Sequence, residues 1–130
     1  MVLVNATKQT VLSDRCHFAN TVWKRMIGLL NRKSLVPGDG LLFDRCYGVH
    51  TFGMRFAIDV LFLDQDPRVI RAVRSLPPFR TCAVKRAVYV LELPLGSVER
   101  SRTAEGDQVQ IRSAEIERKP VVPVQVAAKV

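Results

Sequence analysis

Two acidic residues stand inside apolar segments of the chain, and they are the first candidates for chemistry. Asp59 lies within the run Ile58–Leu63, and Glu92 lies within Val90–Leu93. A carboxylate surrounded by apolar residues must be paired, hydrogen-bonded or neutralised. Two such carboxylates in one small domain could form an acid/base pair, because the charge of one raises the pKa of the other. They could equally hold separate loops in place, and the structural interpretation is favoured for both.

Asp59 has three interpretations. As a structural acid it would accept backbone N–H bonds from the loop His50–Arg55, or pair with Arg25 or Arg55. As a catalytic residue it would be a general acid or base with a shifted pKa. As a third possibility, its carboxylate would orient a bound ligand. The first interpretation is favoured. His50 is expected to form a hydrogen bond within its Gly-flanked loop, and a proton-transfer role opens for it if it lines a pocket with Asp59.

Cysteine and histidine residues form two close couples. Cys46 and His50 stand four residues apart, and Cys16 and His17 are adjacent. Zinc could be held by ligands from two loops, but neither couple has the C-x-x-C spacing of zinc ribbons and fingers. A nucleophile pair of Cys46 and His50 lacks a recognisable third residue to orient the histidine. We therefore expect no metal and no cofactor, and we interpret the cysteines, Cys82 included, as small buried hydrophobic residues.

Composition restricts the class of protein further. A chain of 130 residues with 48% hydrophobic content fits one globular domain. The sequence shows no apolar run near the ~18 residues of a membrane-spanning helix, and its first residues lack the pattern of a secretory leader. An odd number of widely spaced cysteines suits a reducing compartment, so we expect a cytoplasmic protein without membrane contact. A phosphate loop, a G-x-S-x-G elbow and an H-E-x-x-H motif are all absent, which disfavours the common enzyme classes without excluding catalysis.

Basic residues outnumber acidic ones and cluster in one part of the chain. The formal net charge is +8, from 20 Lys and Arg against 12 Asp and Glu. Such an excess favours encounters with nucleic acid, anionic lipid or acidic proteins. The nearest aromatic residues, Phe79 and Tyr89, do not form the stacking platform of RNA-binding sheets. A solvated face that protects sheet edges is therefore the favoured interpretation of the cluster, which consists of Arg68, Arg71, Arg74, Arg80, Lys85 and Arg86.

Alternating apolar residues and turn signals predict many short strands. Strands are expected at 2–7, 10–12, 40–43, 58–63, 69–74, 87–93 and 108–112. A helix is expected over 22–30, a single helical turn over 97–100 and a loop over 13–17. These elements predict an α+β domain: a compact, largely antiparallel, β-barrel-like sheet with one main helix in the N-terminal half and short helical turns. The globular domain is expected to span 1–112, and 113–130 to be an extended arm or a frayed tail.

Several segments between residues 19 and 112 also follow one another in a recognisable order. They are Arg25–Arg32 with Leu35, Gly40–Phe43, His50–Asp64, Val90–Gly96 and Gly106–Val109. In this order they resemble DUF192, an uncharacterised family of bacteria and archaea. The resemblance implies a small mixed domain with a β-barrel-like core and no established activity. Where the family's central motif commonly carries Trp, Lys, Asn and Pro, this chain has Phe52, Arg55, Phe56 and Ala57.

The leading functional hypothesis is a non-enzymatic accessory domain that binds a small ligand or a partner protein. The family-like residues concentrate in one loop and two strand acids, without a nucleophile–base constellation. The expected recognition surface consists of Tyr47, His50, Phe52, Met54, Arg55, Asp59 and Glu92. The first alternative is an enzyme that uses Asp59 and Glu92, with or without His50, in acid/base chemistry. The second alternative is nucleic-acid association through the basic cluster Arg68–Arg86.

Overall fold

A computed structural model describes residues 1–19 and 35–112 of the chain. Within these ranges the chain forms ten strands and one short helix: β1 (Val2–Asn5), β2 (Thr10–Ser13), β3 (Arg15–Ala19), β4 (Asp39–Asp44), β5 (Gly48–His50), β6 (Ile58–Leu63), β7 (Val69–Leu76), β8 (Thr81–Ala83), β9 (Tyr89–Pro94), α2 (Ser97–Arg100) and β10 (Val109–Arg112).

A five-stranded sheet in the order β3-β4-β9-β6-β7 forms the centre of the molecule. Its pairs are antiparallel except for β3 and β4, which run parallel. Every residue of β6 is buried, because this inner strand is covered on both faces of the sheet. Burial on both faces explains why its sequence is an almost continuous apolar run rather than an alternating one.

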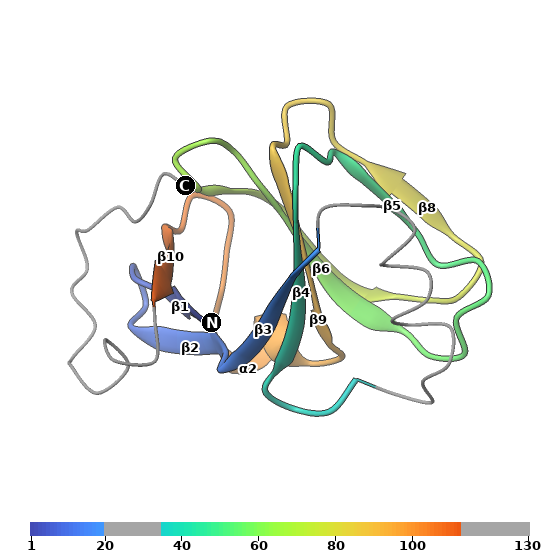
Figure 1. Cartoon of the computed structure of the whole chain (residues 1–130), viewed down its shortest axis with the longest axis horizontal. Helices are drawn as coiled ribbons and strands as arrows, with labels where there is room; N and C mark the ends of the chain where they lie inside the picture. Colours follow the sequence, from blue (N-terminus) through green and yellow to red (C-terminus); the bar gives the residue numbers. More distant parts are fainter. Residues whose placement is uncertain (20–34, 113–130) are drawn as a thin grey trace.

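Two hydrophobic cores lie on opposite faces of this central sheet. Side chains alternate along a strand, so Leu61 and Val60 of β6 point to opposite faces. Leu61 belongs to the first core, which β1, β2, β10 and α2 cover, together with buried residues such as Leu3. Val60 belongs to the second core, which β5 covers through Val49. The central sheet is therefore the middle layer of the molecule (Figure 1).

The outer layers are two smaller sheets. A three-stranded sheet in the order β10-β1-β2 lies on one side, and the two-stranded β5–β8 ribbon lies on the other (Figure 1). Within residues 1–19 and 35–112 these sheets stay separate, so the expected barrel-like core is wrong. Alternating apolar residues identify which face of a strand is buried, but they do not identify which strands share a sheet. This sequence closes its cores by stacking layers on the central sheet.

The expected α+β class is also wrong, because strands dominate the described chain. The helix in the described ranges is α2, which has four residues and occupies the predicted helical turn over 97–100. The α+β expectation depended on a main helix over 22–30, and those residues lie outside the described ranges. The predicted arm or tail over 113–130 lies outside them as well. In the part of the chain that the structure describes, no helix has the length and apolar character needed to span a bilayer.

Several predicted strand positions are confirmed, although the predicted fold class is wrong. The predicted strand over 58–63 is confirmed as β6, and its hairpin partner is confirmed as β7. The predicted pairing of the first two strands is confirmed by the antiparallel contact of β1 with β2. The loop expected over 13–17 is wrong, because Arg15–Ala19 forms β3 and pairs with β4. A short, mixed segment gains its strand structure here from an edge position on the central sheet.

Candidate functional site

The turn that follows β5 and the segment that precedes β8 form a hydrogen-bonded corner around Thr51. This residue is fully buried, and its hydroxyl donates to the carbonyl of Pro77 at 2.7 Å. The same hydroxyl accepts the backbone N–H of Arg80 at 2.9 Å. The backbone N–H of Thr51 donates to the carbonyl of Arg80 at 2.9 Å, which continues the ladder of the ribbon. One buried side chain thus ties two distant segments of the chain together.

Aromatic side chains project from this corner into solvent. The ring of His50 lies 5.8 Å from that of Phe52 in a tilted arrangement. Phe52 in turn meets Phe79 edge-on at a centroid distance of 6.3 Å. Phe52 is 50% exposed and Phe79 62%; Tyr47, which lines a pocket together with His50, is 57% exposed. Each of these residues therefore leaves half or more of its surface to solvent. We call the surface formed by Tyr47, His50, Phe52 and Phe79 the aromatic face.

Phe79 has an unusual backbone conformation. Its φ angle is +62°, in the left-handed region that bulky side chains rarely adopt. The backbone N–H of Phe79 donates to the carbonyl of Thr51 at 3.1 Å, so the corner holds the residue in this conformation. A backbone strained in this way costs about 1–3 kcal/mol and occurs preferentially at functional sites. Burial of the Phe79 ring offsets little of this strain energy, because the ring is largely exposed.

A shallow pocket of about 470 Å³ opens on the ribbon beside the aromatic face, and its lining is mainly apolar. Its lining residues are Arg45, Cys46, Tyr47, Gly48, Val49, His50, Thr81, Cys82 and Ala83. The Nδ1 atom of His50 is buried, yet it makes no hydrogen bond within the described structure. A buried polar atom without a partner is rare in folded proteins and requires an explanation.

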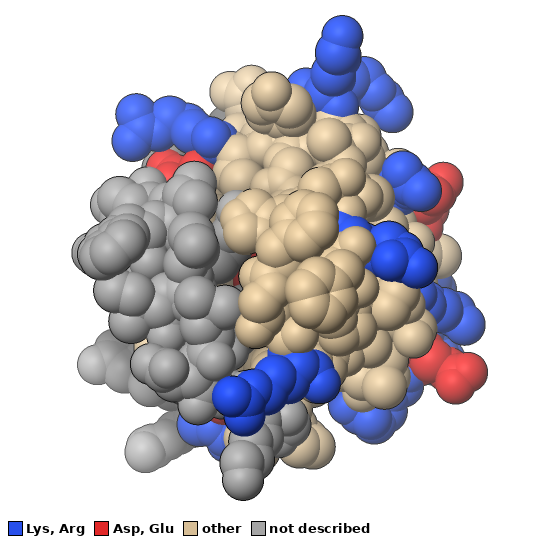
Figure 2. Space-filling model, turned by 90° about the vertical axis from the view of Figure 1, so that its right-hand side faces the viewer, with Lys and Arg blue, Asp and Glu red and all other residues tan. Residues whose placement is uncertain are grey.

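The surroundings of the aromatic face are basic. The two segments that build it, residues 45–57 and 77–90, contain five basic residues and no acidic residue. All five are exposed: Arg45, Arg55, Arg80, Lys85 and Arg86. Figure 2 shows the side of the molecule that carries β5 and β8, with blue Lys and Arg side chains above, to the right of and below a mainly uncharged centre, and a few red Asp and Glu side chains at the margins. The site therefore combines exposed rings with a positive rim, which we call the basic rim.

Asp59 lies away from this face and has two backbone partners. Its Oδ1 accepts the N–H of Ser75 at 2.9 Å, and its Oδ2 accepts the N–H of Val98 in α2 at 2.9 Å. The pairing of β6 with β7 shifts register beside Asp59, so a bulge around Ser75 frees the N–H that the carboxylate accepts. The second bond satisfies one of the unpaired N–H groups at the start of α2. Asp59 thus joins β7 to α2 on the first core's side.

Glu92 points to the opposite face of the central sheet from Asp59. In the β6–β9 pair, Asp59 stands opposite Leu93, and Glu92 stands opposite Val60. Opposed residues share a face, so Asp59 is on the side of the first core and Glu92 on the side of the second. Glu92 is fully buried and has its own polar or electrostatic partner. The structure therefore does not bring these two carboxylates together.

The remaining predicted site residues divide between surface and core. Tyr47, His50 and Phe52 belong to the aromatic face, and exposed Arg55 belongs to its rim. Met54 is 5% exposed and packs in the second core, so its side chain lies beneath the surface. Sequence reasoning missed Thr51 and Phe79. The Pro77–Pro78 pair that precedes Phe79 is the sequence signal that indicates a turn there.

The cysteines do not converge either. Cys16 lies in the first core and Cys46 against the second, on opposite faces of the central sheet. Burial raises the pKa of the Cys16 thiol to about 12, although the nearby N-terminal ammonium acts in the lowering direction. All three cysteines are free thiols. Among residues 1–19 and 35–112, no group of three or more His, Cys, Asp or Glu side chains is placed to hold a metal ion.

The basic cluster Arg68–Arg86 is divided by the fold. Arg68 donates through Nη1 to the carbonyl of Gly106, and Arg74 lies 4.0 Å from the carboxylate of Glu99. These contacts are on the side of α2 and β10, away from the ribbon. The members Arg80, Lys85 and Arg86 belong to the basic rim instead. A contiguous sequence cluster therefore supplies only part of one surface.

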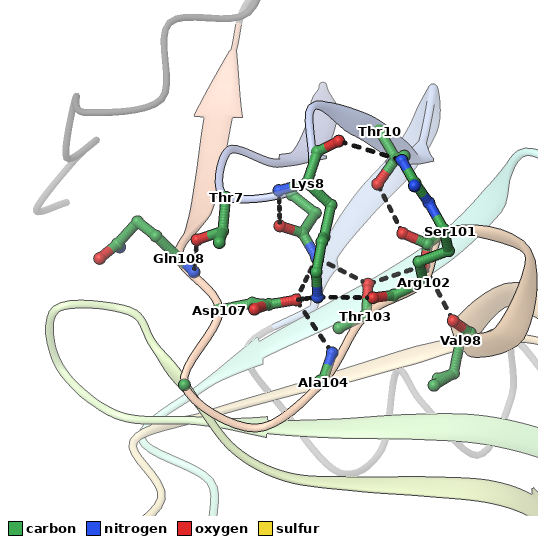
Figure 3. Close-up of polar contacts among 12 residues, drawn as sticks. Thr7, Lys8, Thr10, Val98, Ser101, Arg102, Thr103, Ala104, Asp107 and Gln108 are labelled. Carbon is green, nitrogen blue, oxygen red and sulfur yellow. Dashed lines mark hydrogen bonds and ion pairs between the residues drawn. The ribbon is translucent and has the colours of Figure 1, made fainter.

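A buried polar network around Asp107 was not anticipated from the sequence. Its carboxylate accepts from the Asn5 amide at 2.9 Å, the Lys8 ammonium at 2.8 Å and the Ala104 N–H at 2.9 Å (Figure 3). The same Asn5 amide donates to the hydroxyl of Thr103 at 2.9 Å. Burial acts to raise the pKa of Asp107, but these hydrogen bonds and the Lys8 charge outweigh it and hold the pKa below 3.8. The network joins β1 to the turn before β10.

Comparisons with known proteins identify relatives but no activity. The model of the DUF192 family, described as "Uncharacterized ACR", matches residues 2–111. A UPF0127 protein of Pyrococcus furiosus is 33% identical over 115 residues, covering 83% of this chain and 96% of the relative. A UPF0127 protein of Pyrococcus abyssi is 31% identical over 116 residues, covering 84% and 96%. The resemblance inferred from the sequence is confirmed, and the match extends to the first strand.

Two crystal structures show the same fold. A putative transcription regulator of Sinorhizobium meliloti superposes with a TM-score of 0.70 at 24% identity, covering 84% of this chain and 89% of that chain. A protein of unknown function from Novosphingobium aromaticivorans superposes with a TM-score of 0.73 at 23% identity, covering 85% and 83%. At these identities the likeness concerns the fold alone.

Proposed function

The chain belongs to the DUF192 family of uncharacterised proteins, and from that premise we propose that it is a non-catalytic recognition domain that binds through its aromatic face. The observation that carries the proposal is the corner around Thr51. It holds Phe79 in a strained conformation and presents two phenylalanine rings to solvent. Rigid, exposed aromatic side chains are typical anchors of binding surfaces, because little conformational entropy is lost when they are covered.

The burial of the other candidates supports a narrower surface than the sequence suggested. Asp59 and Glu92 are 1% and 0% exposed, so a partner resting on the surface would not reach them. Both oxygens of Asp59 already accept backbone N–H groups, which favours a structural role over acid/base catalysis. We propose that Asp59, Glu92 and Met54 support the layer beneath the site, while Tyr47 and its neighbours make the contacts.

We also propose that the protein works in the cytoplasm. The support is the state of its three cysteines, which are all free thiols. Cys46 and Cys82 line the open pocket beside the aromatic face, where an oxidising compartment would expose them to disulfide exchange. Fractionation of cells that express the natural protein, followed by immunoblotting, would test the proposal. Recovery from the periplasm or the medium would contradict it.

Nuclear magnetic resonance titration provides the test of the binding function. Isotope-labelled full-length protein would be titrated separately with indole, adenosine monophosphate, dodecathymidylate and a hexaglutamate peptide. We expect amide shifts in residues 45–57 and 77–86 with at least one probe, and a loss of these shifts in Phe79→Ala. The matched control is Phe18→Ala, because Phe18 is 48% exposed on β3, in a different sheet from the ribbon.

Two outcomes would contradict the proposed function. The first is a shift pattern centred on a second pocket, which lies between β2 and α2 and includes Thr10, Ser13 and Arg100. The second is turnover of a screened metabolite that Asp59→Asn abolishes while the variant remains folded. In either case the aromatic face would not be the principal site.

A further inference from the structure

The basic rim determines the charge of any partner that covers the aromatic face. Residues 45–57 and 77–90 contribute five positive charges and no negative ones. The closest acid in sequence, Asp44, is already 3.7 Å from Arg45 through Oδ2 and Nε. A second copy of this chain would place the same positive rim against itself, which disfavours self-association through this face. The complementary partner is therefore an anion.

The exposed rings restrict the chemical class of the anionic partner. The face of an aromatic ring carries partial negative charge, so a carboxylate of an acidic peptide is not attracted to it. Nucleobases, in contrast, have flat π-faces that stack on aromatic side chains, whatever the base. Phe52 and Phe79 expose half or more of their surface, and the centroids of neighbouring rings lie 5.8–6.3 Å apart. Such a surface fits bases that are free to stack.

The pocket on the ribbon adds a place for a base. Its volume of about 470 Å³ is within the range of small-molecule sites, and its mainly apolar lining suits a flat ring. His50 lines this pocket beside Thr81 and Cys82. A duplex hides the faces of its bases, so only an unpaired strand can use rings and pocket together.

From these observations we propose that the aromatic face binds single-stranded nucleic acid. Bases stack on Phe52 and Phe79, one base occupies the pocket beside His50, and the basic rim contacts phosphates. This inference rests on the proposed function, because it names the partner of the same surface. It differs from the association through Arg68–Arg86 that the sequence suggested, since Arg68 and Arg74 have partners elsewhere.

Fluorescence anisotropy with labelled dodecathymidylate and dodecauridylate tests the inference on the full chain. At fixed salt we expect Phe79→Ala and Phe52→Ala each to weaken binding at least fivefold, because a base loses its stacking partner. The slope of log K against log salt should stay unchanged in these variants. If the four rim cations other than Arg45, which pairs with Asp44, contact phosphates, that slope in the parent is about −2.8. Phe18→Ala is the matched control for the rings and should bind like the parent.

A second pair of variants separates stacking from general charge. Arg80→Gln should reduce the steepness of the salt dependence by about 0.7, as expected for the loss of one phosphate contact with a single strand. Arg100→Gln removes an exposed cation from α2, away from the ribbon, and should leave the slope unchanged. Equal effects of Arg80→Gln and Arg100→Gln, with no effect of the ring variants, would overturn the inference and indicate non-specific charge.

The outcomes also distinguish this inference from the proposed function. If the oligonucleotides do not bind but labelled hexaglutamate does, with the same dependence on Phe79, the partner is an acidic peptide. The inference is then overturned and the recognition function stands. If neither probe depends on Phe52 or Phe79, and titration maps no probe to the ribbon, both are overturned. A duplex of the same length that binds as tightly as the single strand would also overturn the inference.

Discussion

The polar groups around α2 have interaction partners within the chain, whereas groups on the aromatic face lack them in the described structure. Near α2, Asp59 uses both carboxylate oxygens to accept backbone N–H groups, and Asp107 binds three donors. On the aromatic face, Phe52 and Phe79 remain half exposed or more, and the Nδ1 of His50 is buried without a described partner. A region whose interactions are satisfied within the chain contributes stability. A region that leaves its interactions unused is available for a partner.

The largest expected effect is in the satisfied region. Asp59→Asn retains the side-chain volume but places an amide N–H₂ against a backbone N–H of Ser75 or Val98. We expect the free energy of unfolding to fall by roughly 3 kcal/mol, because a buried donor loses a charged acceptor. Urea denaturation followed by circular dichroism measures this change. Asp66→Asn is the matched control, since Asp66 is exposed and offers only backbone contacts, and it should shift stability by less than ~0.5 kcal/mol.

A variant Asp59→Asn as stable as its parent would break the comparison. It would mean that the carboxylate of Asp59 does not stabilise the fold, as is often true of functional groups. Ligand screens should then start at Asp59.

The next effect concerns the network around Asp107. Asp107→Asn weakens the contacts with Lys8 and Ala104, so we expect a loss of about 2 kcal/mol at neutral pH. The folded pKa of Asp107 lies below its ordinary value of 3.8, so its ionisation stabilises the fold. This contribution is fully present above pH 3.8 and is lost as the pH falls through the folded pKa. The stability difference between parent and variant should therefore shrink at acidic pH.

Unfolding curves at several pH values between 7 and 2 measure this difference. Glu105→Gln is the matched control, because Glu105 is exposed in the same turn, and its difference from the parent should stay near zero. A difference for Asp107→Asn that grows on acidification would contradict the assigned direction of the pKa shift.

A smaller effect is expected at Thr51, which shares a property with each of the two regions. Thr51 is buried like the groups near α2, but its hydroxyl holds the corner that carries Phe79. Thr51→Val should lower the free energy of unfolding by about 1–2 kcal/mol, because the carbonyl of Pro77 and the N–H of Arg80 lose their partner. It should also weaken oligonucleotide binding although Thr51 lies beneath the surface. Thr51→Ser keeps the hydroxyl and should retain most of both properties.

The features that could be predicted from the sequence are those that depend on local sequence, and the features that could not are those that depend on contacts between distant segments. The apolar run of β6 and the turn at Ser97–Arg100 were predictable, because local periodicity and turn chemistry determine them. The burial of Asp59 was predictable from its apolar neighbours in the strand. Its partners were not, because they come from a bulge in β7 and from α2, which the chain brings together only in three dimensions.

The site illustrates the same limit. Tyr47, His50 and Phe52 were proposed as site residues because they concentrate in one loop, and that assignment stays a prediction. Phe79 was not proposed, because it joins them through the ladder between β5 and β8, and register is a property of pairs of strands. The acid/base pair of Asp59 with Glu92, which the sequence left open as an alternative, does not form for a related reason. Residues with opposite parity on neighbouring strands face opposite sides of a sheet, and the register of β6 with β9 decides the parity.

The most direct test of the central claim, that Phe79 serves binding rather than folding, is the pair of measurements on Phe79→Gly. Glycine adopts a φ of +62° without strain, so its greater unfolded-state entropy is offset. We predict a free energy of unfolding that stays within about 1 kcal/mol of the parent or rises, together with at least a fivefold loss of dodecathymidylate affinity. A loss of more than ~2 kcal/mol in stability, or unchanged affinity in a stable variant, would contradict the account.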